Sequence, residues 1–580
     1  MTSAADTHHM ARAPRTGRVL RTGHARRAVR PQTALLTAVR RRAAALAAVL
    51  MTGVTSVSGC AGSPAAPPPG TAGGGELVFA TGRQPDCLDP QVSPTDIAGL
   101  IDRNIFDSLV LMTPDRQFKP WLAHRWRISP DGLTYTFWLR DGVTFHDGSR
   151  LDAAAVKATL DHAVDPGTKS QYAAGLISAY REAQVVNDLT VRVRLKHPST
   201  PFLQALSTPY LGIQSPKAIG ENAGNLCVRP VGSGPFRMVS WTKNTSVVLR
   251  RNDAYRWAAP GLGHRGPVRL DSLVIRFITE EAARFGALTS GQADVIDEVP
   301  PVQAKNLRRY DELRYQRVRS PGAVYALQLN SRSGPLADLR VRRALLASID
   351  LDRLVKAVYF GQYERAWSPL SPVSFGYDPS VSRSWPHDPE RAARFLDAAG
   401  WHDRDSEGYR VRDGRRLRLI WPFAAQYQAS ANTLAQGIQA EAKKAGIEID
   451  YVGQDTGAFG ETIAHRRLDL YGTSFVRAEP DILRFFYASD QTHEQGGGNV
   501  FGVADPHLDR ALNGAARSSD PRARERAYAA AQQILVDRAL VLPVYVPAQL
   551  VGSADQVRGM TFDAVGFPLF YGVRLKEVRR

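Results

Sequence analysis

The chain has 580 residues, of which 43% are hydrophobic and 22% are charged, and its formal net charge is +18. This length exceeds one ordinary domain, and the composition is that of a globular protein rather than a disordered one. Residues 1–60 hold ten arginines against one acidic residue, Asp6, so half of the positive excess lies in this segment. Elsewhere basic and acidic residues are mixed and no basic run is interleaved with aromatic residues, which argues against nucleic-acid binding.

An export signal with a lipid attachment site is predicted near the N-terminus. Three arginines, residues 40–42, precede a mainly apolar run at 43–57. This run is shorter than the roughly 20 residues of a spanning helix and suits the core of a signal peptide. It ends in Val57-Ser58-Gly59-Cys60, which resembles the lipobox of bacterial lipoproteins, in which the cysteine is acylated. We therefore expect residues 1–59 to be a signal peptide and Cys60 to carry lipid; the alternative is a short buried helix with an incidental cysteine.

The segment that follows predicts a flexible tether. Residues 61–75 (AGSPAAPPPGTAGGG) have no side chain able to build a core, so we expect residues 60–75 to hold a folded body away from the membrane. Two further cysteines remain in that body, Cys87 and Cys227. An exported location permits them to form a disulfide, and two separate buried thiols are the alternative.

Strands and helices are predicted in alternation along the body. Residues 76–80 form a β-rich run, and residues 129–132 (SPDG) predict a turn before a strand at 133–140. We expect Asp141-Gly142 to close a hairpin onto a strand at 143–145. Further strands are predicted at 246–249, 273–277 and 541–546.

Two helix starts carry the same signal, an N-cap aspartate followed by proline at the first helical position. They are Asp388-Pro389, in a helix that ends at Gly400, and Asp520-Pro521. Helices that alternate with strands over this length predict an α/β protein of several lobes.

Spaced motifs in a fixed order resemble those of the family 5 solute-binding proteins of bacterial ABC importers, the dipeptide, oligopeptide and nickel-binding group. The resemblance covers roughly residues 77–575. The motifs are Leu122-Ala123, Trp126, 131–137 (DGLTYTF), Leu139-Arg140, Gly142-Val143, 145–148 (FHDG), 230–236 (PVGSGPF), Arg251-Asn252, Tyr255, Ala287-Leu288, Ser290-Gly291, Asp294-Val295, Asn330, Val341-Arg342, Ala344-Leu345, Ile349-Asp350, 398–401 (AAGW) and Asp520-Pro521.

The resemblance implies a periplasmic-binding-protein-like α/β fold of the cluster C type, with two lobes, a hinge and an extra N-terminal subdomain. Lobe I would comprise residues 76–110, the extra subdomain 111–228, residues 229–327 and a C-terminal part at 546–580, while lobe II would span 328–545. Cys87 and Cys227 would then both lie in lobe I, which favours the disulfide. A ligand would be captured as the hinge closes, and the partners would be the permease and ATPase subunits.

Relatives that bind peptides hold the ligand's ammonium group with an Asp and, in dipeptide binders, its carboxylate with an Arg two positions before a Tyr. In this sequence the Tyr matches Tyr427, but the Arg position falls on Ala425 and the Asp position on about Val476. Arg477 could instead pair with an anionic ligand, since its planar guanidinium suits carboxylate or phosphate; a surface arginine is the alternative.

Aromatic side chains and one amide complete the candidate ligand site. Phe475 and Trp367 are candidate walls of the site, with core packing the favoured interpretation for Trp367 and for Tyr487. Asn330, from the motif series, is a further candidate. Arg484 has the same ambiguous status as Arg477.

No catalytic, metal or cofactor site is predicted. The thirteen histidines form no HExxH motif, and the sequence has no CxxC, no P-loop and no G-x-S-x-G elbow. We therefore expect a monomeric binding protein rather than an enzyme, lipid-anchored at the extracellular face of the bacterial plasma membrane. A peptide or peptide-like solute is the expected ligand. A nickel-type metal chelate, another anionic solute, a sensor role or a secreted hydrolase are the alternatives.

Overall fold

A seven-stranded sheet brings together strands from distant parts of the chain. The computed structural model describes residues 74–576 except 222–223, 308, 425–428 and 496, and these fall within one compact unit, Pro69–Arg580. Along the sheet the strands are β12 (Leu313–Arg319), β22 (Ala548–Ala554), β11 (Val295–Ile296), β1 (Glu76–Thr81), β10 (Ser272–Phe277), β9 (Ser246–Arg251) and β8 (Phe236–Thr242). We call residues 74–319 and 548–576, which build on this sheet, lobe I.

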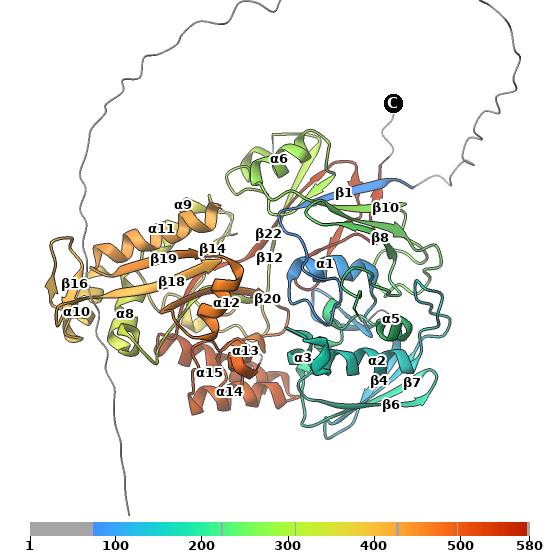
Figure 1. Ribbon diagram of the computed structural model, residues 1–580, viewed down its shortest axis with the longest axis horizontal. Helices are drawn as coiled ribbons and strands as arrows, with labels where there is room; N and C mark the ends of the chain where they lie inside the picture. Colours follow the sequence, from blue (N-terminus) through green and yellow to red (C-terminus); the bar gives the residue numbers. More distant parts are fainter. Residues whose placement is uncertain (1–73, 222–223, 308, 425–428, 496, 577–580) are drawn as a thin grey trace, which may run out of the picture. The chain divides into compact units, whose positions relative to one another are not determined.

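The predicted strands of this sheet are confirmed. The β-rich run at 76–80 forms β1, and the runs at 246–249 and 273–277 form β9 and β10. Leu77 and Phe79 of β1 are fully buried beside Leu273 and Ile275 of β10, to which β1 runs parallel. Figure 1 shows the red C-terminal strand β22 in the same lobe as the blue β1 and the green β8 and β10. Apolar side chains from both ends of the chain therefore share one core.

A second sheet of lobe I corrects one sequence prediction. Its order is β4 (Ala123–Ile128), β5 (Thr134–Leu139), β7 (Thr190–Leu195) and β6 (Tyr180–Asn187). The turn before β5 is confirmed, with the Gly132 amide donating to the Ser129 carbonyl at 2.9 Å. The predicted hairpin of β5 with residues 143–145 is wrong, because β4 and β7 occupy both edges of β5. Residues 143–145 instead pair with the segment that follows them, where the Leu151 amide donates to the Val143 carbonyl.

We call residues 322–546 lobe II; its main sheet has four strands and a neighbouring parallel pair. The sheet runs β14 (Glu364–Arg365), β21 (Val541–Val546), β13 (Gly322–Leu329) and β20 (Leu470–Val476), and the pair is β18 (Arg418–Ala424) with β19 (Glu448–Gln454). The predicted strand at 541–546 is β21. Minor strands are β2 (Val110–Met112), β3 (Phe118–Pro120), β15 (Asp403–Arg404), β16 (Arg410–Arg412), β17 (Arg415–Arg416), β23 (Val557–Arg558), β24 (Thr561–Phe562), β25 (Pro568–Leu569) and β26 (Arg574–Leu575).

The helices follow the strands in alternation, which confirms the α/β prediction. In lobe I they are α1 (Asp96–Ile105), α2 (Ala153–Val164), α3 (Ala173–Leu176), α4 (Pro201–Ala205), α5 (Pro216–Glu221), α6 (Glu281–Thr289) and α7 (Ala304–Leu307). In lobe II they are α8 (Leu339–Ser348), α9 (Leu351–Val358), α10 (Pro389–Ala398), α11 (Ala429–Lys444), α12 (Thr456–Ala464), α13 (Ile482–Tyr487), α14 (Pro506–Arg517) and α15 (Pro521–Asp537). The short 3₁₀ turns are η1 (Pro166–Thr168), η2 (Pro209–Leu211), η3 (Pro335–Ala337), η4 (Pro379–Val381) and η5 (His493–Gln495).

Both predicted helix starts are confirmed. The Asp388 carboxylate accepts the amide of Arg391 at the start of α10, and the Asp520 carboxylate accepts the amide of Arg522 at the start of α15. In each case a proline occupies the first turn, where its missing amide hydrogen costs the helix nothing. Gly400 follows α10 with a φ of +82°, which ends that helix.

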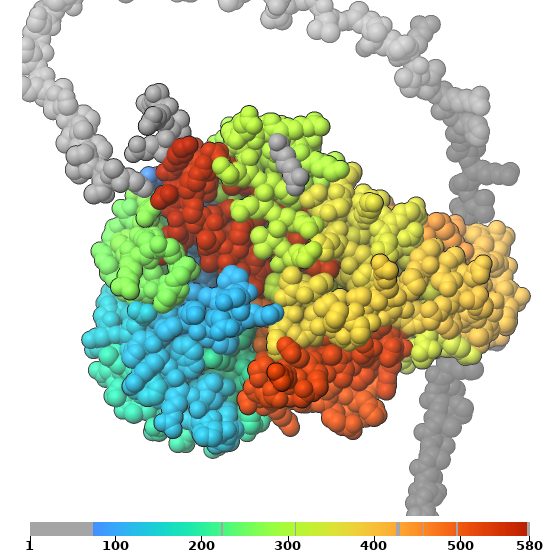
Figure 2. All heavy atoms as spheres, turned by 180° about the vertical axis from the view of Figure 1, so that it is seen from behind, coloured from blue at the N-terminus to red at the C-terminus, as the bar shows by residue number. Residues whose placement is uncertain are grey.

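The chain passes between the two main sheets twice. Residues 320–321 join β12 to β13, and Pro547 joins β21 to β22. Because β12 pairs with β22 in lobe I and β13 pairs with β21 in lobe II, the two crossings run between neighbouring strands. Figure 2 shows the red C-terminal residues against the green residues of lobe I. The predicted lobe borders at 327–328 and 545–546 stay predictions.

Candidate functional site

The candidate site lies where the carboxyl ends of strands from both lobes meet. In lobe I, β1 leads into residues 82–96, which carry the chain to α1. In lobe II, β20 ends at Val476, and the Arg477 amide donates to the carbonyl of Pro321 in the crossing segment. Carboxyl ends of strands at a change of chain direction are the usual place for ligand sites in open α/β sheets.

Arg477 connects the two lobes at this point. Its Nη1 donates to Oδ1 of Asp96 at 2.6 Å, and its Nε donates to the Tyr172 hydroxyl at 2.6 Å. The Arg477 side chain is 7% exposed and that of Asp96 is 21% exposed. Burial disfavours the charged guanidinium, but Tyr172, Tyr210 and Asp96 outweigh it and raise the pKa of Arg477 well above its ordinary value. Arg477 is therefore a buried cation paired with a carboxylate of the opposite lobe.

Aromatic rings surround this ion pair. The guanidinium carbon of Arg477 lies 4.4 Å from the ring centre of Tyr172, 5.0 Å from that of Tyr210 and 5.1 Å from that of Phe475. Tyr172 also meets Phe475 and Phe485 of lobe II, with ring centres 6.5 Å and 6.3 Å apart. Such rings exclude water from the guanidinium while their π faces attract its charge.

Two cavities lie next to residues 477–478 of lobe II. One, of about 110 Å³, is lined by Tyr172, Gln204 and His197 of lobe I and by Arg477 and Asp481, among others, of lobe II. The other, of about 60 Å³, is lined mainly by apolar side chains of lobe I and reaches Ala478. Gln204 lines both cavities. The space between the lobes is thus partly polar and partly apolar.

The lobe II wall of the larger cavity carries both acidic and basic side chains. Glu479 forms an ion pair with Arg524, and the Tyr528 hydroxyl lies 3.4 Å from both Glu479 and Asp481. One hydroxyl proton serves only one of these carboxylates at a time. Burial raises the pKa of Asp481 to about 7, against the lowering effect of Arg484. Arg484 itself is held by Asp490 at 2.5 Å.

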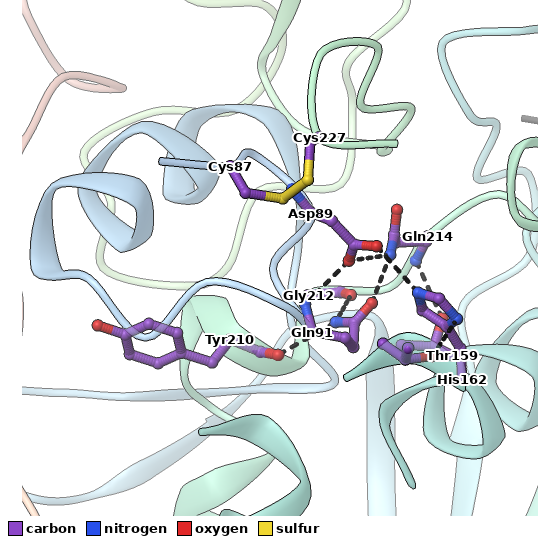
Figure 3. Close-up of polar contacts among 10 residues, drawn as sticks. Cys87, Asp89, Gln91, Thr159, His162, Tyr210, Gly212, Gln214 and Cys227 are labelled. Carbon is purple, nitrogen blue, oxygen red and sulfur yellow. Dashed lines mark hydrogen bonds and ion pairs between the residues drawn. A yellow bond between two sulfur atoms is a disulfide. The ribbon is translucent and has the colours of Figure 1, made fainter. Parts of the chain in front are cut away.

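The loop that carries Asp96 is fixed by a disulfide and a buried polar network (Figure 3). Cys87 and Cys227 are bonded, with their Cα atoms 4.4 Å apart. The neighbouring Asp89 accepts from Gln214 Nε2 at 2.9 Å and lies 2.9 Å from His162 Nε2.

The same network reaches Tyr210. Gln91 Nε2 donates to the Tyr210 carbonyl at 3.1 Å, and Figure 3 shows this bond beside the Asp89 cluster. The Tyr210 hydroxyl in turn donates to Asp96 Oδ1 at 3.2 Å. The lobe I half of the site is therefore cross-linked through side chains that are far apart in sequence.

The structure brings some of the predicted site residues together and places others elsewhere. Phe475 and Arg477 lie in the contact between the lobes, as described, and Val476 ends β20 with its carbonyl accepting from Arg477 Nη1. Trp367 lies against the Arg365 guanidinium, 4.5 Å away, and lines neither cavity. Asn330 uses its amide group within the turn after β13, donating to Ser333 Oγ and the Leu468 carbonyl.

Other predicted residues fall outside the site or outside the described residues. Tyr427 and Cys60 belong to the segments that the structure does not describe. Tyr487 is 4% exposed and belongs to a hydrophobic core cluster of lobe II. Three site residues were not predicted from the sequence: Asp96, Tyr172 and Tyr210. Thr95-Asp96 carries the signal of a helix start, but nothing in the sequence placed this helix start opposite Arg477.

Neither metal ligation nor a membrane span is found in the described part of the chain. Over residues 74–576, apart from the gaps, no three His, Cys, Asp or Glu side chains are grouped as metal ligands would be. No helix within the same ranges combines the length and apolar character that crossing a bilayer requires.

Comparisons with known proteins find similar sequences over most of the chain. A model of the family described as "Bacterial extracellular solute-binding proteins, family 5 Middle" matches residues 117–497. The glutathione-binding protein GsiB of Salmonella paratyphi A is 28% identical over 493 residues, which cover 83% of this chain and 91% of GsiB.

Solved structures share the fold at lower identity. DppA from Helicobacter pylori, in complex with the peptide STSA, has a TM-score of 0.75 at 24% identity over 87% of this chain and 99% of DppA. AppA from Bacillus subtilis, in complex with a nonapeptide, has a TM-score of 0.77 at 21% identity over 87% of this chain and 99% of AppA. NikA from Brucella suis, in complex with Fe(III)-EDTA, has a TM-score of 0.75 at 24% identity over 86% of this chain and 100% of NikA.

Proposed function

Because the chain belongs to the family 5 bacterial extracellular solute-binding proteins, we propose that it captures a peptide or peptide-like solute between lobes I and II and delivers it to an ABC permease. The observation that carries this proposal is the buried contact of Arg477 with Asp96 and Tyr172, beside a cavity lined from both lobes. Closure of two lobes around a solute is productive only if the closed state binds that solute better than the open state.

A peptide-like ligand is supported by the chemistry of the cavity walls. The larger cavity combines a hydroxyl and an amide from Tyr172 and Gln204, the carboxylates of Glu479 and Asp481, and the aromatic ring of Phe485. Peptides present amides, charged ends and apolar side chains, which such a mixed wall can match. The similarity to a glutathione-binding protein and to peptide-bound structures supports the same class.

A metal chelate is the second candidate. The similarity to NikA, solved with Fe(III)-EDTA, favours it. A chelate that brings its own ligands would need oxyanion contacts from the protein rather than metal ligands, and Arg477 and Arg517 at the cavity are suitable donors. Further alternatives are another anionic solute and a sensor that does not feed a permease.

A lipid anchor on Cys60 is part of the proposal. The lipobox-like residues 57–60 and the Pro- and Gly-rich residues 61–75 support attachment of the folded body to the outer face of the plasma membrane. Acyl chains contribute about 0.8 kcal/mol per buried methylene, and stable anchoring takes more than one chain. We expect Cys60→Ser to move the protein from the membrane fraction to the medium; equal membrane retention of both forms would contradict lipidation of Cys60.

Calorimetry of the protein with glutathione, short neutral peptides and a nickel–histidine chelate tests the ligand class. We expect a peptide-type ligand to bind unaltered and to raise the melting temperature. Arg477→Ala should weaken this binding at least tenfold, about 1.4 kcal/mol, because the lobes lose their buried contact. Arg418→Ala is the matched control, since Arg418 pairs with Asp450 within lobe II and lines neither cavity. Chemical conversion of the ligand, or no binding by any of these solutes, would contradict the proposal.

A further inference from the structure

Arg477 occupies a cage whose polar groups beyond its own strand come from lobe I. Its cationic head contacts the Asp96 carboxylate and the Tyr172 hydroxyl at 2.6 Å each, and its Nη2 lies 3.5 Å from the Pro94 carbonyl. The rings of Tyr172 and Tyr210 complete the enclosure. Lobe II contributes the occupant and, through Phe475, one further ring.

The cage is held together by contacts that do not involve Arg477. The Tyr210 hydroxyl donates to Asp96 and lies 3.4 Å from the Thr95 carbonyl, and the rings of Tyr172 and Tyr210 meet edge to face at 5.0 Å. Gln91 Nε2 donates a hydrogen bond to the Tyr210 carbonyl and so holds the backbone of Tyr210 (Figure 3). These contacts all lie within lobe I and do not involve the Arg477 side chain.

The chemistry of the cage selects a cation. One carboxylate, a backbone carbonyl, a tyrosine hydroxyl and two aromatic faces are the groups with which proteins bind guanidinium and ammonium ions. Another cation of lobe I, Arg83, also interacts electrostatically with Asp96, but its ion pair is with Glu298 at 3.1 Å.

The cage also adjoins the space proposed for the ligand. Tyr172 and Arg477 both line the larger cavity between the lobes. A solute in that cavity therefore lies beside the cage, and its cationic group would compete with Arg477 for the same carboxylate.

We infer that the cage of Asp96, Pro94, Tyr172 and Tyr210 is a binding site for guanidinium or primary ammonium groups, and that Arg477 is its built-in occupant. Binding of an external cation there and closure of the lobes through Arg477 exclude each other. The ligand that is trapped on closure thus brings no cation to this point, because the protein supplies its own. This last step rests on the proposed function, whereas the cage itself does not.

Rescue of an emptied cage by a small cation tests the inference. In Arg477→Ala, methylguanidinium should raise the melting temperature in a saturable way, with a Kd of about 1 mM, and methylurea, which has the same shape without the charge, should not. The unsubstituted protein should respond at least tenfold more weakly, because Arg477 fills the cage. Adding Asp96→Asn to Arg477→Ala should abolish the effect, and Arg484→Ala, which empties no cage, should show none.

Two results would overturn the inference. One is a folded Arg477→Ala protein that responds equally to methylguanidinium and methylurea, and the other is a response that persists after Asp96→Asn is added. Small-angle X-ray scattering of the unsubstituted protein gives a second test, should Arg477→Ala not fold. High methylguanidinium should then increase the radius of gyration by separating the lobes, while methylurea leaves it unchanged; equal radii would refute the cage. These tests need no transported ligand, so they stand apart from a failure of the proposed function.

Discussion

The two halves of the site are built by different means. In lobe I, a disulfide and side-chain hydrogen bonds tie together the loop of Asp96, helix α2 and the backbone of Tyr210. In lobe II, Arg477 is placed by strand pairing, since Val476 pairs with Gly322 and the Arg477 amide donates to Pro321. One half is thus fixed by side chains and a covalent bond, and the other by main chain next to a crossing between the lobes.

This difference determines where each half is vulnerable. The lobe I half should respond to loss of particular side chains, because each closes a contact between distant segments. The lobe II half should tolerate many side-chain changes but not a shift of the backbone at residues 320–322 and 476–477. A backbone-held arginine beside the crossing can move with lobe II as a unit, while its cage stays formed in lobe I.

The largest effect is expected from removing the disulfide. Replacing Cys87 and Cys227 together by Ala opens a link between residues 140 positions apart and should lower the free energy of unfolding by about 4 kcal/mol. Urea denaturation measures this loss. Because the link holds the loop of Asp96, ligand affinity should fall as well. Cys60→Ser is the control. If the double variant and this control had equal free energies of unfolding, the hydrogen-bond network alone would be sufficient to stabilise lobe I.

A smaller loss is expected from Gly322→Ala in lobe II. Gly322 has a φ of +103°, and a Cβ there would overlap the Arg477 amide nitrogen and the Phe475 carbonyl oxygen. We expect a loss of about 3 kcal/mol in the free energy of unfolding and a displaced Arg477, measured by denaturation and by ligand affinity.

Gly361→Ala is the matched control for this substitution. Gly361 also has a positive φ, +75°, but no atom lies within 4 Å of a Cβ placed there. It should therefore cost only the backbone strain, about 1 kcal/mol. Equal losses for the two glycines would mean that the approach to Arg477 is not what constrains residue 322.

The smallest effect is expected from a change at Asp102, a buried carboxylate of lobe I. Both oxygens of Asp102 are buried without a hydrogen-bond partner among the described residues, and burial, with Asp89 and Asp86, raises its pKa well above the ordinary value. The folded state therefore holds this proton more tightly than the unfolded chain does. The stabilisation is complete below the unfolded pKa of about 3.9 and is lost as the pH rises through the raised pKa.

Asp102→Asn removes the loss of stability that ionisation of Asp102 causes at high pH. It should stabilise the protein at pH 8 by about 1 kcal/mol and flatten the dependence of melting temperature on pH. Asp311→Asn, at an exposed position, is the control. A melting curve of Asp102→Asn with the same pH dependence as the unsubstituted protein would contradict this reading.

Local sequence signals predicted local structure well. Asp388 and Asp520 marked helix starts because capping chemistry depends on a few neighbouring residues, and β1, β9, β10 and β21 followed from their apolar runs. The predicted hairpin at Asp141-Gly142 was wrong, because strand pairing depends on segments that are far apart in the sequence. Gly142 has a positive φ of +74° but Asp141 does not, so the predicted turn is absent, and the partners of β5 are set by distant strands that a short segment cannot specify.

The candidate site was only partly predictable. Arg477 and Phe475 were proposed from the resemblance, yet the groups that hold Arg477 come from Asp96, Tyr172 and Tyr210, which are separated from it by hundreds of residues. Their meeting depends on how the two lobes pack. The roles proposed for Tyr427, Trp367, Val476 and Asn330 in ligand binding stay predictions.

The position of β22 has a consequence for biosynthesis. This strand, residues 548–554, lies between β12 and β11, and its Leu550 carbonyl accepts the amide of Val299. Both main sheets are therefore incomplete until the chain has been synthesised past residue 540, because β21 of lobe II spans Val541–Val546 and β22 of lobe I follows at Ala548–Ala554. Such long-range pairing forms slowly. A nascent chain that ends before these strands leaves the main sheet of each lobe open.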